Sequence, residues 1–183
     1  AAFVAGDEPQ ALLALLALTN SAAFRTLVSL QLAAADAAAR SYEVGVIQRT
    51  PVPELSPDAE DHLAGLARRS WSLKRSLDTA KVTSHAFVLP ALLQTEGATL
   101  AERVAAHAER VAETGAALTQ IQAEIDDRCF DLYRFAPEDR AAVLGGTGAG
   151  DAGAEVAAYA GGDAREAEDE DAEGLTSAAG APE

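Results

Sequence analysis

The hydrophobic positions divide the chain into a first helical region, a short β-favouring stretch, a long helical region and a polar tail. Residues 9–35 are good helix formers, interrupted at residues 19–21, where either Asn20 or Ser21 can cap a second helix that carries Phe24 and Leu27. Residues 11–18 are apolar on all sides, and such a helix must be buried on most of its surface. This pattern predicts two consecutive helices that pack against a larger body.

Residues 41–53 are the one stretch that favours a β-strand. Residues 41–50 read SYEVGVIQRT, and the Pro51-Val52-Pro53 sequence ends the stretch. A single isolated strand cannot pair its own backbone N–H and C=O groups. We therefore expect a strand that completes a sheet whose other strands lie upstream of Ala1.

Residues 57–132 contain two arms with heptad-like spacing. The first seam has spacings of 3-4-3-4 and one polar member: Leu63, Leu66, Ser70, Leu73 and Leu77. The second seam recurs every seven residues: Val104, Val111, Leu118, Ile125 and Leu132. Its companion positions are only partly apolar: Leu100, His107, Thr114, Ile121 and Arg128. With the apolar residues 86–93 and Gly97 as connector, the pattern predicts an antiparallel, coiled-coil-like helical hairpin; the weaker second arm also fits ordinary helical packing against a neighbour.

From Gly145 onward the chain consists mostly of Gly, Ala, Asp and Glu, with ten acidic residues against Arg165 alone. Such a segment cannot offset its ordering entropy by burial, so we expect a disordered acidic tail or linker. The predicted fold class is mainly α: a helical fragment with one short β segment, a long helical hairpin and this tail. The expected divisions are residues 1–55, residues 56–144 and residues 145–183.

Charge and composition say more about where in the cell this protein is located than about what it binds. The formal net charge is −15, of which −9 falls in residues 145–183, so the remainder is only mildly acidic. No signal peptide is recognisable, and the apolar run at residues 11–18 is too short to span a bilayer. A single Cys129 excludes an internal disulfide framework. We expect a cytoplasmic protein without a membrane partner, and the missing initial Met indicates a fragment of a larger one.

Residues that carry catalysis, cofactors or metals do not converge in this sequence. Gly148, Gly150 and Gly153 match a G-x-G-x-x-G pattern, but a dinucleotide loop must follow a strand and open a helix, so we interpret these glycines as a linker. The histidines at positions 62, 85 and 107 are scattered, with Cys129 as the only thiol, so we expect no metal site. We expect His107 to set the register of its seam and Cys129 to pack as a small apolar side chain. We predict no catalytic, cofactor-binding or metal-binding residue.

Two groups of residues could contact DNA. One is a basic cluster in which Arg68 and Arg75 lie seven residues apart on one face: Arg68, Arg69, Lys74, Arg75 and Lys81. That face could follow phosphates, or it could be a solvated helix face with local ion pairs. The other group surrounds the predicted strand: Arg40, Tyr42, Gln48 and Arg49. Arg and Gln side chains fork onto guanine and adenine edges, whereas the alternative is an edge strand with ordinary polar exposure.

The order of several short motifs resembles one family. Residues 15–21 (LLALTNS) followed by an aromatic at Phe24 resemble a turn late in the target-recognition domains of adenine-specific DNA methyltransferases, and residues 42–53 resemble the strand and Pro-x-Pro exit that follow it. Residues 73–78, 87–93 and 126–133 resemble the helical spacer beyond, the last being similar to an Ile-Asp-x-x-Val-Tyr-Glu-Leu-Tyr ending. The family is the type IIG restriction–modification methylases, which include the PglX methyltransferases of BREX phage-defence systems. The resemblance covers about residues 10–144.

The resemblance implies that this chain is the C-terminal recognition and scaffold portion of an enzyme that transfers a methyl group from S-adenosylmethionine to the exocyclic amine of adenine. The cofactor glycines and the Asn-Pro-Pro-Tyr-type motif of such an enzyme match no position here, and residues 50–53 (TPVP) lack the amide and the aromatic that hold a flipped base. Double-stranded DNA is then the partner of the parent enzyme. Two alternatives stay open: a coiled-coil module that self-associates through residues 104–132 or binds defence-system partners, and a regulatory segment whose acidic tail mimics nucleic acid.

Overall fold

The computed structural model describes residues 8–34 and 44–146. In chain order these residues form α1 (Pro9–Thr19), α2 (Ala22–Ala34), α3 (Val44–Arg49), α4 (Pro57–Asp78), the short 3-10 helix η2 (Ala91–Leu93), α5 (Leu100–Tyr133) and α6 (Pro137–Gly146). None of the described residues forms a strand. The mainly helical fold class is therefore confirmed. The predicted acidic tail lies outside the described residues, except for Gly145 and Gly146, which end α6.

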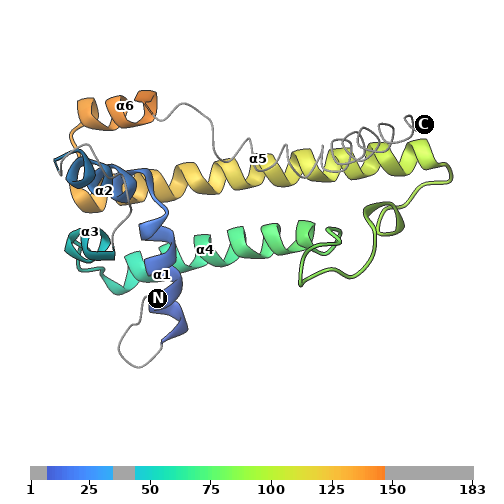
Figure 1. Ribbon diagram of the computed structural model, residues 1–183, viewed down its shortest axis with the longest axis horizontal. Helices are drawn as coiled ribbons and strands as arrows, with labels where there is room; N and C mark the ends of the chain where they lie inside the picture. Colours follow the sequence, from blue (N-terminus) through green and yellow to red (C-terminus); the bar gives the residue numbers. More distant parts are fainter. Residues whose placement is uncertain (1–7, 35–43, 147–183) are drawn as a thin grey trace, which may run out of the picture.

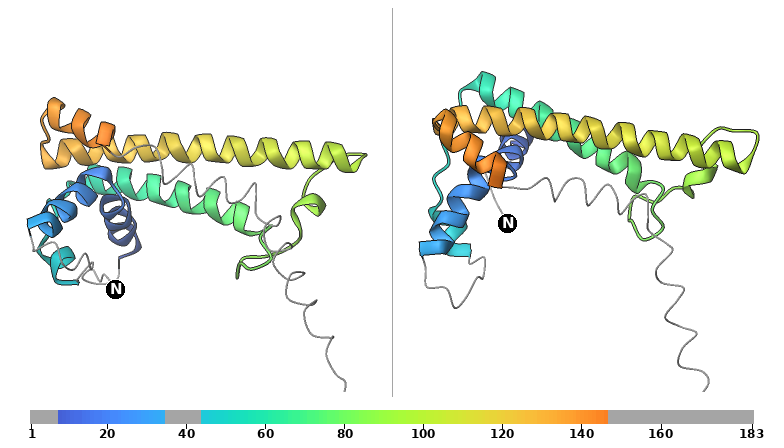
Figure 2. Two further views of the ribbon diagram at one scale, coloured as in Figure 1. Left: turned by 45° about the horizontal axis from the view of Figure 1, so that its top comes forward. Right: turned by 90° about the horizontal axis from the view of Figure 1, so that it is seen from above.

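The two long helices α4 and α5 lie side by side and run in opposite directions (Figure 1). At 22 and 34 residues they differ in length, so α5 extends beyond the end of α4. Helix α1 crosses the N-terminal half of α4, while α2 and α6 gather around the C-terminal part of α5 (Figures 1 and 2). We call the region formed by α1, α2, α6, the N-terminal half of α4 and the C-terminal part of α5 the packed end. We call residues 79–110, at the other end of the α4–α5 pair, the projecting arm.

The prediction of a β-strand is wrong for the part of residues 41–53 that the structure describes. Residues 44–49 form the helix α3, and the remaining residues of the β-favouring stretch before Val44 lie outside the described residues. A strand needs a neighbouring strand to pair its backbone groups, and the part of the chain that the structure describes offers none. A helix pairs these groups within the segment itself. The predicted end of the element is confirmed, because α3 stops at Arg49, directly before Thr50 and Pro51.

Local polar groups set the other helix boundaries. The Asn20 side chain donates to Leu16 O at 2.8 Å at the end of α1, and Ser21 Oγ accepts from Phe24 N at 3.2 Å at the start of α2. Of the two predicted caps for the second helix, Ser21 is therefore the one used. Helix α5 begins with a capping box, in which Thr99 Oγ1 accepts from Glu102 N at 3.2 Å and Glu102 Oε2 accepts from Thr99 N at 3.0 Å.

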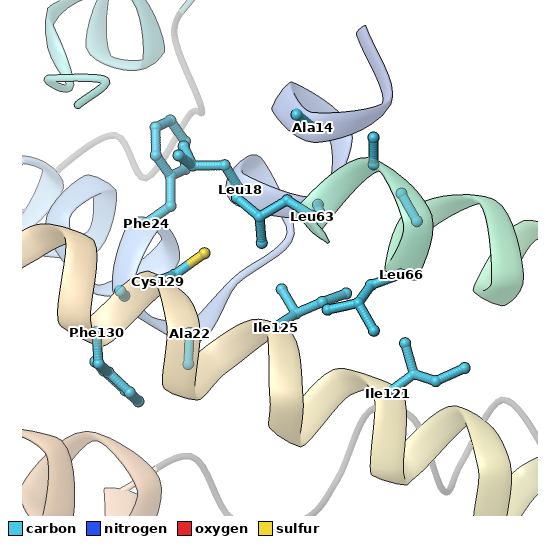
Figure 3. Packing of buried hydrophobic residues seen from close by; sticks show 14 of the residues in the cluster. Ala14, Leu18, Ala22, Phe24, Leu63, Leu66, Ile121, Ile125, Cys129 and Phe130 are labelled. Carbon is cyan, nitrogen blue, oxygen red and sulfur yellow. The ribbon is translucent and has the colours of Figure 1, made fainter. Parts of the chain in front are cut away.

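The apolar core lies at the packed end (Figure 3). Leu18 of α1 and Leu63 of α4 are fully buried and point toward Ile125 of α5. Phe130 points to the opposite side of α5, where its ring lies 5.3 Å from that of Phe135. The core therefore surrounds the C-terminal part of α5, with α1, α2 and α4 on one side and the chain leading into α6 on the other.

The predicted seams are buried only in part. Leu63, Leu66 and Leu77 of the first seam are buried, as are Val111, Leu118 and Ile125 of the second. Val104 at the start of the second seam is 50% exposed, and its companion Leu100 is 67% exposed. None of residues 79–110 is buried. The two long helices thus share apolar contacts near the packed end and lose them along the projecting arm.

No single one of the described helices is long and apolar enough to cross a membrane. Helix α1 and the first part of α2 meet the length and composition criteria together, but the pair is bent by 64°.

Candidate nucleic-acid interface

Helix α3 presents two of the four residues that the sequence analysis assigns to DNA. Gln48 and Arg49 are exposed, whereas Arg40 and Tyr42 lie outside the described residues. Arg49 Nε donates to Gly45 O at 2.9 Å, which fixes the direction of the side chain along α3. The two terminal nitrogens of a guanidinium form the fork that recognises a guanine edge or a phosphate. The short helix α3 therefore exposes an amide at Gln48 and an oriented guanidinium at Arg49.

Two hydrogen bonds tie the segment that follows α3 to the packed end. Gln31 Nε2 of α2 donates to Thr50 Oγ1 at 2.8 Å, and the Tyr133 hydroxyl of α5 donates to Pro51 O at 2.8 Å. Burial raises the pKa of Tyr133 to about 12, with a smaller contribution from Cys129, so the phenol keeps its proton as a donor at neutral pH. These bonds hold the C-terminal end of α3 against the helical core.

A buried polar joint connects the α1–α2 corner to α5. Asp126 Oδ1 accepts from Ala22 N at 2.6 Å and from Gln122 Nε2 at 3.0 Å, although 104 residues separate Asp126 from Ala22. Gln122 Nε2 also lies 3.3 Å from Asn20 O. Burial raises the pKa of Asp126 above its ordinary value, while the two hydrogen bonds and Arg25 act in the opposite direction. The carboxylate supplies an acceptor for the first turn of α2, which is a structural role.

Cys129 takes part in packing, and His62 takes part in a contact between helices. Cys129 is fully buried beside Ser21, and burial raises the pKa of its thiol, which keeps the thiolate population low. His62 Nε2 of α4 lies 3.0 Å from Glu124 Oε1 of α5. His107 is partly buried on α5 and His85 is exposed in the projecting arm. Across residues 8–34 and 44–146, no three His, Cys, Asp or Glu side chains gather in a way that could hold a metal ion.

The basic cluster lies along the second half of α4 and just beyond it. Arg68, Arg69 and Arg75 are exposed, and Arg68 donates to Gln10 Oε1 of α1 at 3.3 Å. Lys74 of α4 is partly exposed, and Lys81 of the projecting arm is exposed. Each of these two lysines has an interaction within the chain. The Arg75 guanidinium lies over the Trp71 ring, 5.4 Å from the centroid.

Sequence reasoning missed Trp71 and Asp126 as notable residues. Trp71 carried a usable signal, because it is the only Trp of the chain and lies between Arg69 and Lys74. Asp126 carried none, since nothing in the sequence connects a carboxylate in the last helical repeat with an amide near residue 22. The glycine pattern at residues 148–153 lies outside the described residues.

Comparison of this chain with known proteins gave no match among family models, curated proteins or solved structures.

Proposed function

We propose that this chain is the C-terminal DNA-recognition and scaffold portion of a site-specific adenine DNA methyltransferase in a restriction–modification or phage-defence system. In this proposal, residues 1–55 end a target-recognition domain and residues 56–144 form a coiled-coil-like helical spacer. The parent enzyme would bind S-adenosylmethionine and carry out methyl transfer outside residues 1–183. The order of the motifs at residues 15–21, 73–78, 87–93 and 126–133 supports this assignment. The motif at residues 42–53 supports it only through its sequence, because residues 44–49 form the helix α3 and not the strand of the family.

The observation that carries the proposal is the presentation of Gln48 and Arg49. Both are exposed on α3, and the segment directly after them is held by the Gln31–Thr50 and Tyr133–Pro51 hydrogen bonds. An α-helix fits the major groove of B-form DNA, and Arg and Gln are the side chains that read guanine and adenine there. A pair on a helix whose end is held by hydrogen bonds suits base recognition better than a pair on an untethered loop.

The test is the affinity of the full chain for a pool of random-sequence duplexes, measured by fluorescence anisotropy at several salt concentrations. Arg49→Ala is compared with Arg128→Ala, because Arg128 is an exposed arginine on a different helix, α5. We expect Arg49→Ala to weaken binding about 5- to 100-fold if it contacts a base, or to reduce the salt slope by about one if it contacts a phosphate. Duplex binding without a salt slope, or equal losses in the two variants, would contradict the proposal.

A second candidate function, a helical protein-interaction module, is favoured by the projecting arm. Four large apolar side chains there are more than 60% exposed: Val82, Val88, Leu93 and Leu100. The buried state of Val111, Leu118 and Ile125 leaves only the start of the second seam available to a partner. Sedimentation over a range of concentrations tests self-association. Leu100→Gln should shift the chain toward monomer, and the matched Leu30→Gln, at a residue 62% exposed on α2, should not.

A further inference from the structure

The outer side of α4 carries a local positive charge on a chain that is acidic as a whole. Residues 66–76 contain Arg68, Arg69, Lys74 and Arg75 and no acidic residue, while the whole chain has a net charge of −15. Beyond its crossing with α1, the side of α4 that faces away from α5 is not covered by another described helix (Figures 1 and 2). Arg68 and Arg75 are both exposed and lie seven residues apart, so they form a short cationic strip on one face of α4, although Arg68 also donates to Gln10 Oε1 of α1 at 3.3 Å.

An exposed aromatic ring lies within this strip. Trp71 is 55% exposed, although the Arg75 guanidinium lies over its ring at 5.4 Å from the centroid. The spacing of three residues from Arg68 to Trp71 and of four from Trp71 to Arg75 places all three on one helix face. The cation–π contact limits the orientations of the indole, which lowers the entropy that a ligand must remove on binding.

We propose that Trp71, Arg68 and Arg75 form a binding site for unpaired nucleic acid, in which a base stacks on the indole face opposite the Arg75 guanidinium and the neighbouring phosphates contact the two guanidinium groups. A single-stranded nucleotide chain is the ligand that matches the charge and the aromatic ring of this surface. A ligand for this strip needs negative charge at the spacing of the arginines and a flat π face for the ring, and a single-stranded nucleotide chain supplies both. In a duplex the same faces are stacked on neighbouring bases and do not reach a side chain.

This site goes beyond the proposed function, because it uses a different helix and a different form of nucleic acid. Gln48 and Arg49 on α3 are proposed to bind a DNA duplex, whereas Trp71 on α4 is proposed to stack on an unpaired base. Loss of one activity therefore does not imply loss of the other.

The uniqueness of Trp71 gives a direct measurement. Its fluorescence is followed while the full chain is titrated with a 15-nucleotide oligothymidine, a 15-base-pair duplex, heparin or a peptide of residues 163–173. We expect saturable quenching by the single strand at concentrations where the duplex quenches much less. Heparin and the acidic peptide test for charge alone, since neither has bases to stack.

Variants locate the site through the anisotropy of a labelled oligothymidine. Trp71→Ala should weaken binding about 5- to 100-fold, the range for loss of one base–aromatic stack, while Trp71→Phe should retain most of the affinity. Phe87→Ala is the matched aromatic control, at a ring 37% exposed in the projecting arm, and Arg128→Ala is the matched charge control for Arg75→Ala. Both controls should bind as the unmodified chain does, and circular dichroism checks that each variant keeps its helices.

Several results would overturn the site. Equal quenching by heparin or by the acidic peptide would show that charge alone is recognised. Equal affinity of Trp71→Ala and the unmodified chain would show that no base stacks there. If duplex binding depends on Arg49 while single-strand binding does not depend on Trp71, the proposed function stands and this inference is removed. If single-strand binding depends on Trp71 while duplex binding does not depend on Arg49, this inference stands and the proposed function is removed.

Discussion

The packed end and the projecting arm use hydrophobic side chains in opposite ways. At the packed end, Leu18, Leu63 and Phe130 are almost completely removed from water. In the projecting arm, Val82 is 73% exposed and Leu100 is 67% exposed, and no residue from 79 to 110 is buried. The same kinds of side chain are thus core in one region and surface in the other.

The projecting arm is nevertheless shaped by specific polar contacts. Gln94 Nε2 donates to Thr79 O at 2.9 Å, which ties the segment around η2 back to the end of α4. Arg103 Nε donates to Gly97 O at 2.9 Å and its Nη1 to Leu92 O at 3.1 Å, which ties the same segment to α5. A net hydrogen bond contributes about 1 kcal/mol, whereas full burial of a Leu or Phe side chain contributes about 1.5–3 kcal/mol. Burial therefore stabilises the packed end, while hydrogen bonds mainly define the conformation of the arm.

The largest expected effect on stability comes from replacing one leucine with alanine in each region. Leu63→Ala should lower the free energy of unfolding by about 2–5 kcal/mol, because a fully buried side chain leaves a cavity. Leu100→Ala should change it by less than about 0.5 kcal/mol, because the side chain is mostly in water already. Urea unfolding followed by circular dichroism measures both. Similar losses in the two variants would contradict the division into a packed end and an arm.

A smaller effect is expected from pH and concerns only the packed end. Burial raises the pKa of Asp126 in the folded chain, so its contribution to stability is fully present below the ordinary carboxyl pKa of about 4 and is lost as pH rises through the raised value. Asp126→Asn keeps an oxygen to accept from Ala22 N but does not titrate. We expect the unmodified chain to lose stability relative to Asp126→Asn as pH rises through this window.

The measurement is the difference in unfolding free energy between Asp126→Asn and the unmodified chain, taken from pH 3 upward in urea. The difference removes contributions that the two chains have in common. A constant difference across the whole range would show that Asp126 has the same pKa in the folded and unfolded chains.

The smallest effect compares two helix caps. Thr99 caps α5 in the projecting arm, and Ser56 caps α4 where Ser56 Oγ accepts from Ala59 N at 3.3 Å. Replacement of either by Ala removes about 1 kcal/mol of local helix stability. We expect Ser56→Ala to lower the global unfolding free energy, because buried Ala59 and Leu63 follow it. Thr99→Ala should instead raise amide exchange about 5-fold within residues 100–104 and leave global unfolding almost unchanged. A global loss in Thr99→Ala would show that the arm and the packed end unfold together.

The sequence alone was sufficient for the features that depend on local contacts. The interruption at residues 19–21, the start of α4 after Ser56 and the two long helices follow from capping residues and apolar spacing, which act within a few residues. The exposed positions of Gln48 and Arg49 also agree with their prediction as surface residues, although the helix that carries them was expected to be a strand. β-Branched residues favour a strand only where another strand is present to pair with it.

The tertiary structure decided what no local pattern could. The heptad spacing marks Leu100, Val104 and Val111 as equivalent, yet only Val111 is buried, because α4 ends before it reaches the start of α5. Asp126 becomes an acceptor for α2 through a contact across 104 residues, and Trp71 becomes a surface ring because its face of α4 lies away from α5. The sequence by itself determined where helices form and which stripes on them are apolar. Only the packing of one helix against another decided which parts of those stripes leave the water, since burial depends on what lies opposite a side chain and not on its neighbours along the chain.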